Sequence, residues 1–370
     1  MTDSIRILSE VADMIGSTFA TPTPTDTPVV QSPLLTLDGL GVSLPSVDGP
    51  FDVLADVDLT VGRGEIIGIA GESGSGKSMT GRALLNLLPD GASTRGTIEF
   101  DGTTLSSLDR KGWQKLRGGE IAMVFQDPTA ALHPMLTVGS QLTEHMRVHL
   151  GLSKSAAKAR AVELLDQVRI PDPKNALKNY PHQFSGGMRQ RIAIAIALAA
   201  EPKLVIADEP TTALDVTVQA GILQLFHRLS SEMDLSVMFI THDLGVLAAL
   251  AERTYVFYAG RVLETAPTEE LLRNPRHPYT SALLKARPET SDVDGVRSEL
   301  TPIKGQPVTA STAPEGCPFA PRCDDAQDAC TGLVPALVRV PIIEDLDMPS
   351  TRHLAACVVH SPAGAVSKES

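Results

Sequence analysis

A run of glycines that ends in lysine and serine has the residue types and the spacing of a phosphate-binding loop. Residues 71–78 read Gly-Glu-Ser-Gly-Ser-Gly-Lys-Ser and fit the pattern G-x-x-x-x-G-K-[ST]. The glycines let successive backbone N–H groups curl around phosphate oxygens, the lysine reaches the β- and γ-phosphates, and the last hydroxyl binds Mg²⁺. The runs 66–70 and 79–88 supply the strand and the helix that such a loop requires. The residues expected to contact a nucleoside triphosphate are Gly71, Glu72, Ser73, Gly74, Ser75, Gly76, Lys77, Ser78 and Met79.

Two adjacent carboxylates form a second group suited to phosphoryl transfer. Asp208 and Glu209 follow the apolar run 204–207, which has the composition of a buried parallel strand. In phosphoryl-transfer sites one such aspartate holds Mg²⁺, and an adjacent glutamate can take a proton from the attacking water. Two carboxylates at a strand end can also simply reach solvent. Beside a complete phosphate loop, we expect Asp208 to bind the metal and Glu209 to act as the general base.

A third motif lies between these two. Residues 184–191 read Phe-Ser-Gly-Gly-Met-Arg-Gln-Arg and precede the apolar, helix-like run 192–200. A Ser-Gly-Gly turn that opens a helix presents free N–H groups with no side chain in the way, so it can bind an anion. Alone the turn is weak support for such a site, because it is also an ordinary helix N-cap. The position of the turn before the strand that ends in Asp208 and Glu209 supports the interpretation as an anion site.

In this order the motifs resemble those of the ATP-binding subunits of ABC transporters. Three further motifs of that family appear at the matching places: Gln126 after the strand-like run 121–125, Ala213-Leu214-Asp215 after the two carboxylates, and His242 after the run 237–240. The resemblance extends from about Leu34 to Pro267.

The resemblance implies an α/β fold, with a P-loop ABC ATPase domain that combines a RecA-like core and an antiparallel β subdomain. A helical subdomain is expected to be inserted in it, and a small Cys-rich extension to follow it. The expected division is a flexible segment at 1–33, the ATPase domain at 34–267 with the helical subdomain at about 137–200, a helical continuation and Pro/Thr/Ser-rich connector at 268–313, and the extension at 314–370.

The resemblance also implies that two ATP-binding domains enclose two nucleotides between them. The phosphate loop of each then faces the Ser-Gly-Gly turn of the other, so Ser185 and Gly187 are expected to serve the partner's ATP. Gly186 and Asp215 belong to the same expected set of ATP-binding residues. Catalysis in such a sandwich is mainly positioning and charge stabilisation.

Individual catalytic roles follow from the same resemblance. Besides Lys77 and the base Glu209, His242 is expected to hold the γ-phosphate, and Gln126 to report that phosphate to the membrane subunits. The implied Mg²⁺ ligands are Ser78, Gln126 and Asp208. The family stacks an aromatic side chain on adenine. Phe51 is the nearby candidate, although it lies closer to the strand-like run 53–60 than the family pattern places it.

Three segments narrow the resemblance to the peptide and nickel importer group, and within it to the D-type ATPase subunit of dipeptide or oligopeptide importers. They are residues 184–191, 208–217 and 274–280, the last reading Asn-Pro-Arg-His-Pro-Tyr-Thr. The implied partners are a second, F-type ATPase subunit, two transmembrane permease subunits and an extracytoplasmic solute-binding protein. The chain would then act at the cytoplasmic face of the cell membrane. Nothing in the sequence separates peptides from a nickel chelate or glutathione as the solute.

All four cysteines lie near the end of the chain, at Cys317, Cys323, Cys330 and Cys357. Clustered cysteines without a secretory signal favour metal binding over disulfides, but this spacing leaves zinc and an iron–sulfur cluster comparable. The region resembles the C-terminal extension of peptide-importer ATPases, which implies a structural 4Fe–4S cluster, with zinc as the alternative. His353 is expected to support the site without being a ligand. Because no cysteine lies in the phosphate loop, we expect their loss to leave ATP binding largely intact.

Composition bears on the remaining classes of function. The chain has 370 residues, a formal net charge of −12 and no long basic run. Nucleic-acid surfaces need clustered Lys and Arg, so a soluble ABC ATPase that acts on nucleic acid or ribosomes is the disfavoured alternative. The longest apolar run, 192–200, is far shorter than the roughly 18 residues of a membrane span. Membrane association is therefore expected to come from partner subunits.

Overall fold

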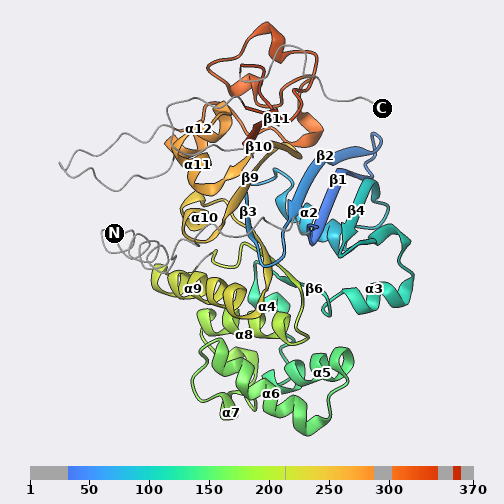
Figure 1. The fold of residues 1–370 in the computed structure, drawn as a ribbon, viewed down its shortest axis with the longest axis vertical. Coiled ribbons are helices and arrows are strands. Elements are labelled where there is room, and N and C mark those ends of the chain that lie inside the picture. The colour runs from blue at the N-terminus through green and yellow to red at the C-terminus, as the bar shows by residue number, and fades with distance from the viewer. Residues whose placement is uncertain (1–31, 213, 287–301, 341–352, 360–370) are drawn as a thin grey trace, which may run out of the picture.

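The computed structural model describes residues 32–212, 214–286, 302–340 and 353–359. Two β-sheets occupy the middle of the molecule, with a group of helices at one end and the C-terminal residues at the other (Figure 1). The expected flexible segment 1–33 lies almost wholly outside the described residues, as does Ala213.

The larger sheet carries the phosphate loop and the two carboxylates. It has eight strands in the order β11-β12-β10-β9-β3-β8-β7-β6, and the run from β9 to β6 is parallel. All residues of β3, β7 and β8 are buried, as the continuous apolar runs predict for strands covered on both faces. Besides β11 and β12, the strands of this sheet are β3 (Ile66–Ala70), β6 (Ile121–Val124), β7 (Leu204–Asp208), β8 (Ser236–Ile240), β9 (Arg253–Tyr258) and β10 (Arg261–Pro267).

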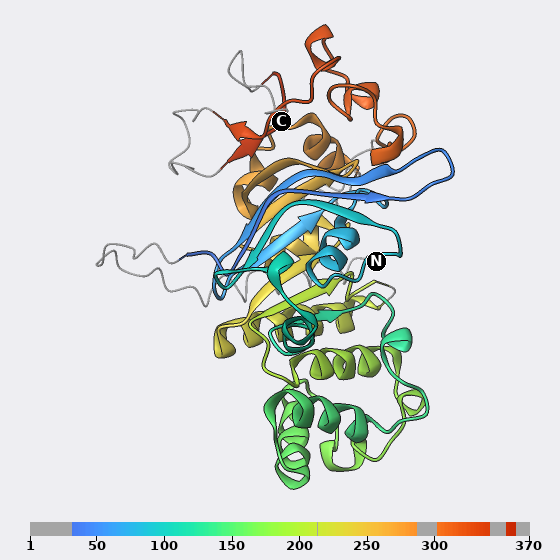
Figure 2. The ribbon, with the colours of Figure 1, turned by 90° about the vertical axis from the view of Figure 1, so that its right-hand side faces the viewer.

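The smaller sheet is antiparallel and lies beside the larger one (Figure 2). Its strand order is β2-β1-β4-β5, with β1 (Leu35–Leu44), β2 (Phe51–Val61), β4 (Ser93–Phe100) and β5 (Thr103–Thr104). Apolar side chains of both sheets form one buried cluster with the first helix, α2 (Lys77–Leu84). A 3₁₀ turn, η1 (Leu105–Ser107), and α3 (Arg110–Leu116) complete this part of the domain.

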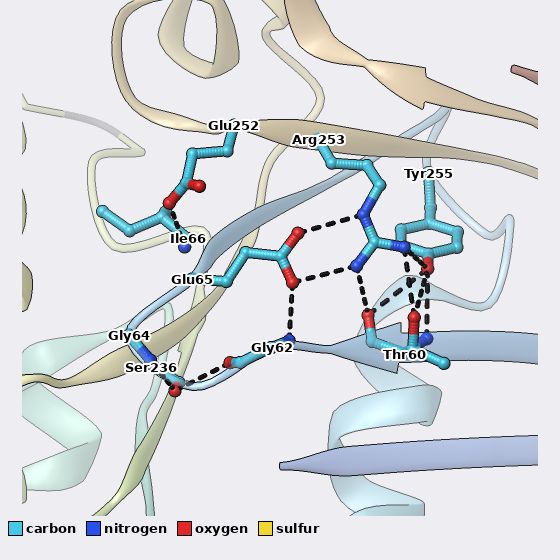
Figure 3. Close-up of polar contacts among 9 residues, drawn as sticks. All are labelled: Thr60, Gly62, Gly64, Glu65, Ile66, Ser236, Glu252, Arg253 and Tyr255. Carbon is cyan, nitrogen blue, oxygen red and sulfur yellow. Dashed lines mark hydrogen bonds and ion pairs between the residues drawn. The ribbon is translucent and has the colours of Figure 1, made fainter. Parts of the chain in front are cut away.

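Arg253 joins the two sheets by polar contacts (Figure 3). From the start of β9 it donates to both carboxylate oxygens of Glu65, at 3.0 and 2.9 Å, and to the carbonyl of Thr60 in β2 at 3.0 Å. Glu65 also accepts from the amide of Gly62. These bonds fix the turn between β2 and β3, and β3 leads directly into the phosphate loop.

The helices between β6 and β7 form the lower part of Figure 1, where the sequence predicts a helical subdomain at about 137–200. They are α4 (Pro128–Ala131), α5 (Val138–Leu150), α6 (Lys154–Gln167), α7 (Pro173–Ala176) and α8 (Gly186–Leu198), with the 3₁₀ turn η2 (Pro181–Gln183) before α8. Thr137, Ser153 and Ser185 are the N-caps of the three longer helices, each accepting a bond from a backbone amide.

The remaining helices follow the strands of the larger sheet and lead into the tail. They are α9 (Val216–Met233), α10 (Leu244–Leu250), α11 (Thr268–Arg273) and α12 (Pro278–Lys285). No helix in the described ranges is long and apolar enough to cross a membrane.

The C-terminal tail extends the larger sheet. Its strand β12 (Leu354–Ala355) pairs with β10, and β11 (Val338–Arg339) pairs with β12. Three short 3₁₀ turns precede them: η3 (Ala310–Thr312), η4 (Ala320–Arg322) and η5 (Asp328–Cys330). Phe319 packs edge-on against Tyr258 of β9, so the tail shares a hydrophobic cluster with the ATPase domain.

Candidate nucleotide-binding site

The phosphate loop connects β3 to α2, as the sequence predicts. Gly71 has a φ of 143°, and a Cβ there would lie 2.2 Å from the carbonyl oxygen of Phe257. Gly76, with a φ of 102°, is the N-cap of α2. Neither position accommodates a side chain without strain, so the glycines of the motif are required by the backbone. The resulting turn places the N-terminus of α2 at the loop.

The lysine of the loop is folded back onto it. The ammonium of Lys77 donates to the carbonyl oxygens of Gly71 at 2.8 Å and Glu72 at 2.9 Å. Burial lowers the pKa of Lys77, while the nearby carboxylates of Glu209 and Asp208 oppose this shift. A bound triphosphate would offer this charge stronger acceptors than two backbone carbonyls.

Ser78 and Asp208 meet across the mouth of the loop. The Ser78 hydroxyl donates to a carboxylate oxygen of Asp208 at 2.8 Å. Burial raises the pKa of Asp208, and the bond from Ser78 opposes that shift. A hydroxyl and a carboxylate at one point form the all-oxygen donor set that Mg²⁺ prefers, so these residues fit the expected metal.

Three side chains converge on Glu209. Its carboxylate accepts from Gln126 Nε2 at 3.1 Å and from the Thr212 hydroxyl at 2.9 Å, and it lies 3.2 Å from His242 Nδ1. Glu209 has a φ of 46°, a region that residues with side chains rarely adopt, and its amide donates to the carbonyl of Ile240. The structure thus brings together three residues expected from different motifs. The sequence did not predict Thr212 as a partner of Glu209.

The Ser-Gly-Gly turn lies apart from this cluster. Ser185 accepts a bond from the amide of Met188 at 3.3 Å, and Gly186 is open to solvent. A Cβ at Gly187 would lie 2.7 Å from a methyl group of Val218 in α9. Asp215 is the N-cap of α9 and accepts from the amide of Val218 at 3.0 Å.

Comparison with known proteins gives the family. A protein of Brucella melitensis named as a peptide import ATP-binding protein is 44% identical over 320 residues, which are 84% of this chain and 95% of that protein. The chain belongs to the ATP-binding subunits of ABC transporters. The oligopeptide transport ATP-binding protein OppD of Bacillus subtilis is 49% identical over 291 residues, or 78% of this chain and 81% of OppD. The family described as ABC transporter matches residues 54–212, and the oligopeptide/dipeptide transporter C-terminal region matches residues 263–330.

Solved structures agree with this assignment. A dimeric ATP-binding cassette in a post-hydrolysis state with ADP and Pi is 30% identical, with a TM-score of 0.57, and covers 63% of this chain and 98% of that one. CbiO1 of Clostridium perfringens is 27% identical, with a TM-score of 0.58, and covers 66% of this chain and 92% of that one. The chain is therefore an ATP-hydrolysing transport enzyme with the ABC ATPase fold.

Two residues of this ATPase subunit contact the phosphate loop from a distance in sequence, and sequence reasoning missed both. The Tyr279 hydroxyl accepts from the amide of Glu72 at 2.9 Å, and Arg322 of the tail donates to the Glu72 carboxylate at 2.6 and 3.2 Å. Tyr279 belongs to the segment 274–280, in which His277 is the N-cap of α12. The sequence features that could have indicated these contacts are Tyr279 in the segment 274–280 and Arg322 directly before Cys323.

The four cysteines of the tail are thiols gathered in one region. Burial, with smaller contributions from nearby Cys330 and Cys357, raises the pKa of Cys317 to about 11. The Cys317 amide donates to the Cys330 carbonyl at 2.9 Å. Within the described ranges, however, no three His, Cys, Asp or Glu side chains are arranged to hold a metal ion.

His353 lies between two carboxylates near these cysteines. Its Nε2 is 2.7 Å from Glu264, and its Nδ1 is 2.9 Å from Glu270. Burial lowers the pKa of His353, but the hydrogen bonds to Glu264 and Glu270 outweigh burial and raise it. The two ring nitrogens of His353 therefore face carboxylates of β10 and α11.

Proposed function

We propose that this chain energises the import of di- or oligopeptides through an ABC transporter. The observation that carries the proposal is the match of residues 263–330 to the oligopeptide/dipeptide transporter C-terminal region, together with the 49% identity to OppD. A nickel chelate or glutathione would use the same ATPase chemistry, but the relatives named for peptides favour a peptide. The alternative of a nucleic-acid or ribosome ATPase has no such support.

In this proposal the residues around the phosphate loop divide the work of hydrolysis. Lys77 exchanges its two backbone acceptors for phosphate oxygens of ATP. Glu209 accepts a proton from the attacking water, while His242 and Gln126 hold its carboxylate and contact the γ-phosphate. Ser78, Asp208 and Gln126 would hold Mg²⁺, which supplies positive charge against the phosphates. Adenine stacking by Phe51 remains a prediction. It is supported by the position of β2, the strand that begins at Phe51, because Leu54 of this strand lies close to Gly76 of the phosphate loop.

The second nucleotide contact would come from another ATPase subunit, of the F type. The observation in favour is that Ser185 and Gly186 are exposed at the start of α8, where Ser185 caps its own helix. The dimeric cassette with ADP and Pi supports such an arrangement. Ser185, Gly186, Gly187 and Asp215 would then complete the partner's ATP site.

An apolar groove supports the proposed pair of permease subunits. It has a volume of about 320 Å³ and lies between the end of β6 and the inserted helices, with Met123, Phe125, Leu132 and Ile196 among its lining residues. Phe125 is 40% exposed, and the adjacent residue Gln126 contacts Glu209. A permease segment in this groove would therefore lie one residue from the catalytic cluster. In this proposal the chain acts at the cytoplasmic face of the membrane, with a solute-binding protein on the other side.

The tail is proposed to hold a 4Fe–4S cluster, with zinc as the alternative. What supports the proposal is the chemistry of the side chains, because the tail holds four cysteines, the donor type that such clusters take, and Cys317, Cys330 and Cys357 are each 7% exposed. When bound, the cluster would cross-link four segments of the tail. Anaerobically purified protein is expected to be brown and to contain about four irons per chain. Stoichiometric zinc without iron would replace this proposal.

Reconstitution tests the proposed function as a whole. The chain is co-expressed with its permease pair, the second ATPase subunit and the binding protein, and the complex is placed in liposomes. ATP is supplied on the side of the ATPase subunits, and the binding protein is on the opposite side of the membrane. Uptake of a labelled tripeptide that depends on ATP supports peptide import. ATP-dependent uptake of a nickel chelate or glutathione, with no peptide uptake, would overturn the substrate and keep the ATPase role.

A further inference from the structure

The phosphate loop is held from outside by the C-terminal tail. The Arg322 guanidinium donates through both terminal nitrogens to the Glu72 carboxylate, at 2.6 and 3.2 Å, and its Nε donates to the Lys304 carbonyl at 2.7 Å. The Arg322 side chain is only 3% exposed, so this ion pair is shielded from solvent on the arginine side. A two-pronged bond of this kind fixes the orientation of the carboxylate as well as its charge.

A second set of contacts ties the same part of the tail to the loop. The Tyr258 hydroxyl lies 3.2 Å from Arg322 Nη1 and 3.3 Å from the amide of Val308. Two residues after Tyr258, the Gly260 amide donates to the Ser75 carbonyl at 3.0 Å, and a Cβ at Gly260 would lie 3.0 Å from Cβ of Ala310. The tail therefore packs against the residues that support the loop.

The carboxylate of Glu72 would repel a bound triphosphate, and its ion pair with Arg322 offsets that repulsion. Glu72 places a carboxylate in a loop that must hold a triphosphate, and like charges at short range repel strongly outside bulk water. Arg322 remains protonated at any relevant pH, so it balances Glu72 permanently. The Tyr279 hydroxyl meanwhile holds the amide of Glu72 at 2.9 Å. Glu72 is thus fixed at its amide by α12 and at its carboxylate by the tail.

We propose that Arg322 is a positioning residue for ATP, which neutralises and orients Glu72 so that the tail sets the affinity of the phosphate loop for nucleotide. The inference rests on the proposed ATP-binding role of this loop. It assigns the tail an effect on the first step of the cycle. Arg322 acts through Glu72, and its removal therefore matters because a negative charge is left beside the phosphates.

Two substitutions that each remove one charge, R322M and E72Q, test the inference alone and combined in the full chain, by calorimetric titration with Mg–ATP. R322M should raise the Kd for ATP about tenfold, because Glu72 is left unbalanced. E72Q is measured as the second reference, and R322M/E72Q should bind ATP within about twofold of E72Q itself, because no carboxylate is then left for Arg322 to balance. High salt should reduce the R322M effect. K304M is the matched control, since it breaks an exposed ion pair with Asp324 in the same tail and should not change Kd.

The outcomes separate this inference from the proposed function. A wild-type chain that binds no ATP would refute the ATP-binding role itself. A wild-type Kd for R322M, or a double variant that binds as weakly as R322M, would overturn the positioning role of Arg322. The second result would mean that the tail supports the loop by packing alone. If thermal melting shows that R322M does not fold, R322Q and R322Q/E72Q make the same comparison, because glutamine also removes the positive charge but keeps a side chain that can donate a hydrogen bond.

Discussion

Oε1 of Glu209 lies 3.2 Å from Nδ1 of His242, although 33 positions separate the two residues. They follow the adjacent strands β7 and β8, which run parallel, so both side chains emerge at the same edge of the sheet. His242 is 60% exposed, whereas Glu209 is 17% exposed. Glu209, the proposed base, is therefore largely enclosed by its own chain, whereas the side chain of His242 is exposed to solvent.

Replacing the base should separate binding from turnover. Glu209→Gln keeps the shape of the side chain but removes the proton acceptor, so the assembled complex should bind ATP normally and hydrolyse it about 100- to 10,000-fold more slowly. Nucleotide titration and phosphate release measure the two effects. Near-normal hydrolysis by the variant complex would contradict the assignment of Glu209 as the base.

Removing the loop lysine should have the opposite signature. Lys77→Ala deletes the ammonium that now bonds the carbonyls of Gly71 and Glu72, so the charge available to the phosphates is lost. We expect the Kd for Mg–ATP to rise at least about tenfold. Arg82→Ala, in the last turn of the same helix, removes a cation outside the loop and serves as the control. Equal effects of the two variants would indicate a general loss of positive potential.

Much of this site was predictable because its parts are local in sequence. The strand and helix flanking Gly71 to Ser78, and the carboxylates after β7, follow from continuous apolar runs and from glycines that the backbone requires. The contacts of Glu72 were not predictable, because Tyr279 and Arg322 reach it across 207 and 250 positions. No pattern within a window of residues encodes such a contact.

The Ser-Gly-Gly turn should matter only in the assembled transporter. Ser185→Ala should leave ATP binding by the isolated chain unchanged, and the complex should lose ATPase activity by about 100-fold. The substitution also removes a helix cap, which costs about 1 kcal/mol. Ser153→Ala removes the equivalent cap of α6 and is the matched control. A fast ATPase from monomeric protein would contradict the need for a second subunit.

Docking of the tail strand should weaken as pH rises. The folded pKa of His353 lies above its ordinary value because Glu264 and Glu270 outweigh burial, so the protonated form stabilises the fold. This contribution is complete below the ordinary histidine pKa of about 6.5 and is lost as pH rises through the folded pKa. Hydrogen exchange of the 353–359 backbone, corrected for the intrinsic rate, should therefore increase over that range. His353→Gln should abolish the dependence, and an unchanged dependence would exclude His353 as its source.

Replacing one cysteine of the tail should weaken ATP binding, whereas the sequence alone predicts that ATP binding stays intact. Absence of cysteines from the phosphate loop predicts that Cys323→Ser leaves ATP binding intact, but Arg322, directly before Cys323, bonds Glu72. If a cluster cross-links the tail, Cys323→Ser should remove the brown colour and the iron, and should also weaken Mg–ATP binding about as much as R322M. Combining Cys323→Ser with E72Q should restore binding without restoring iron. Iron loss with a wild-type Kd for ATP would show that the fold of the tail holds Arg322 in place without the cluster.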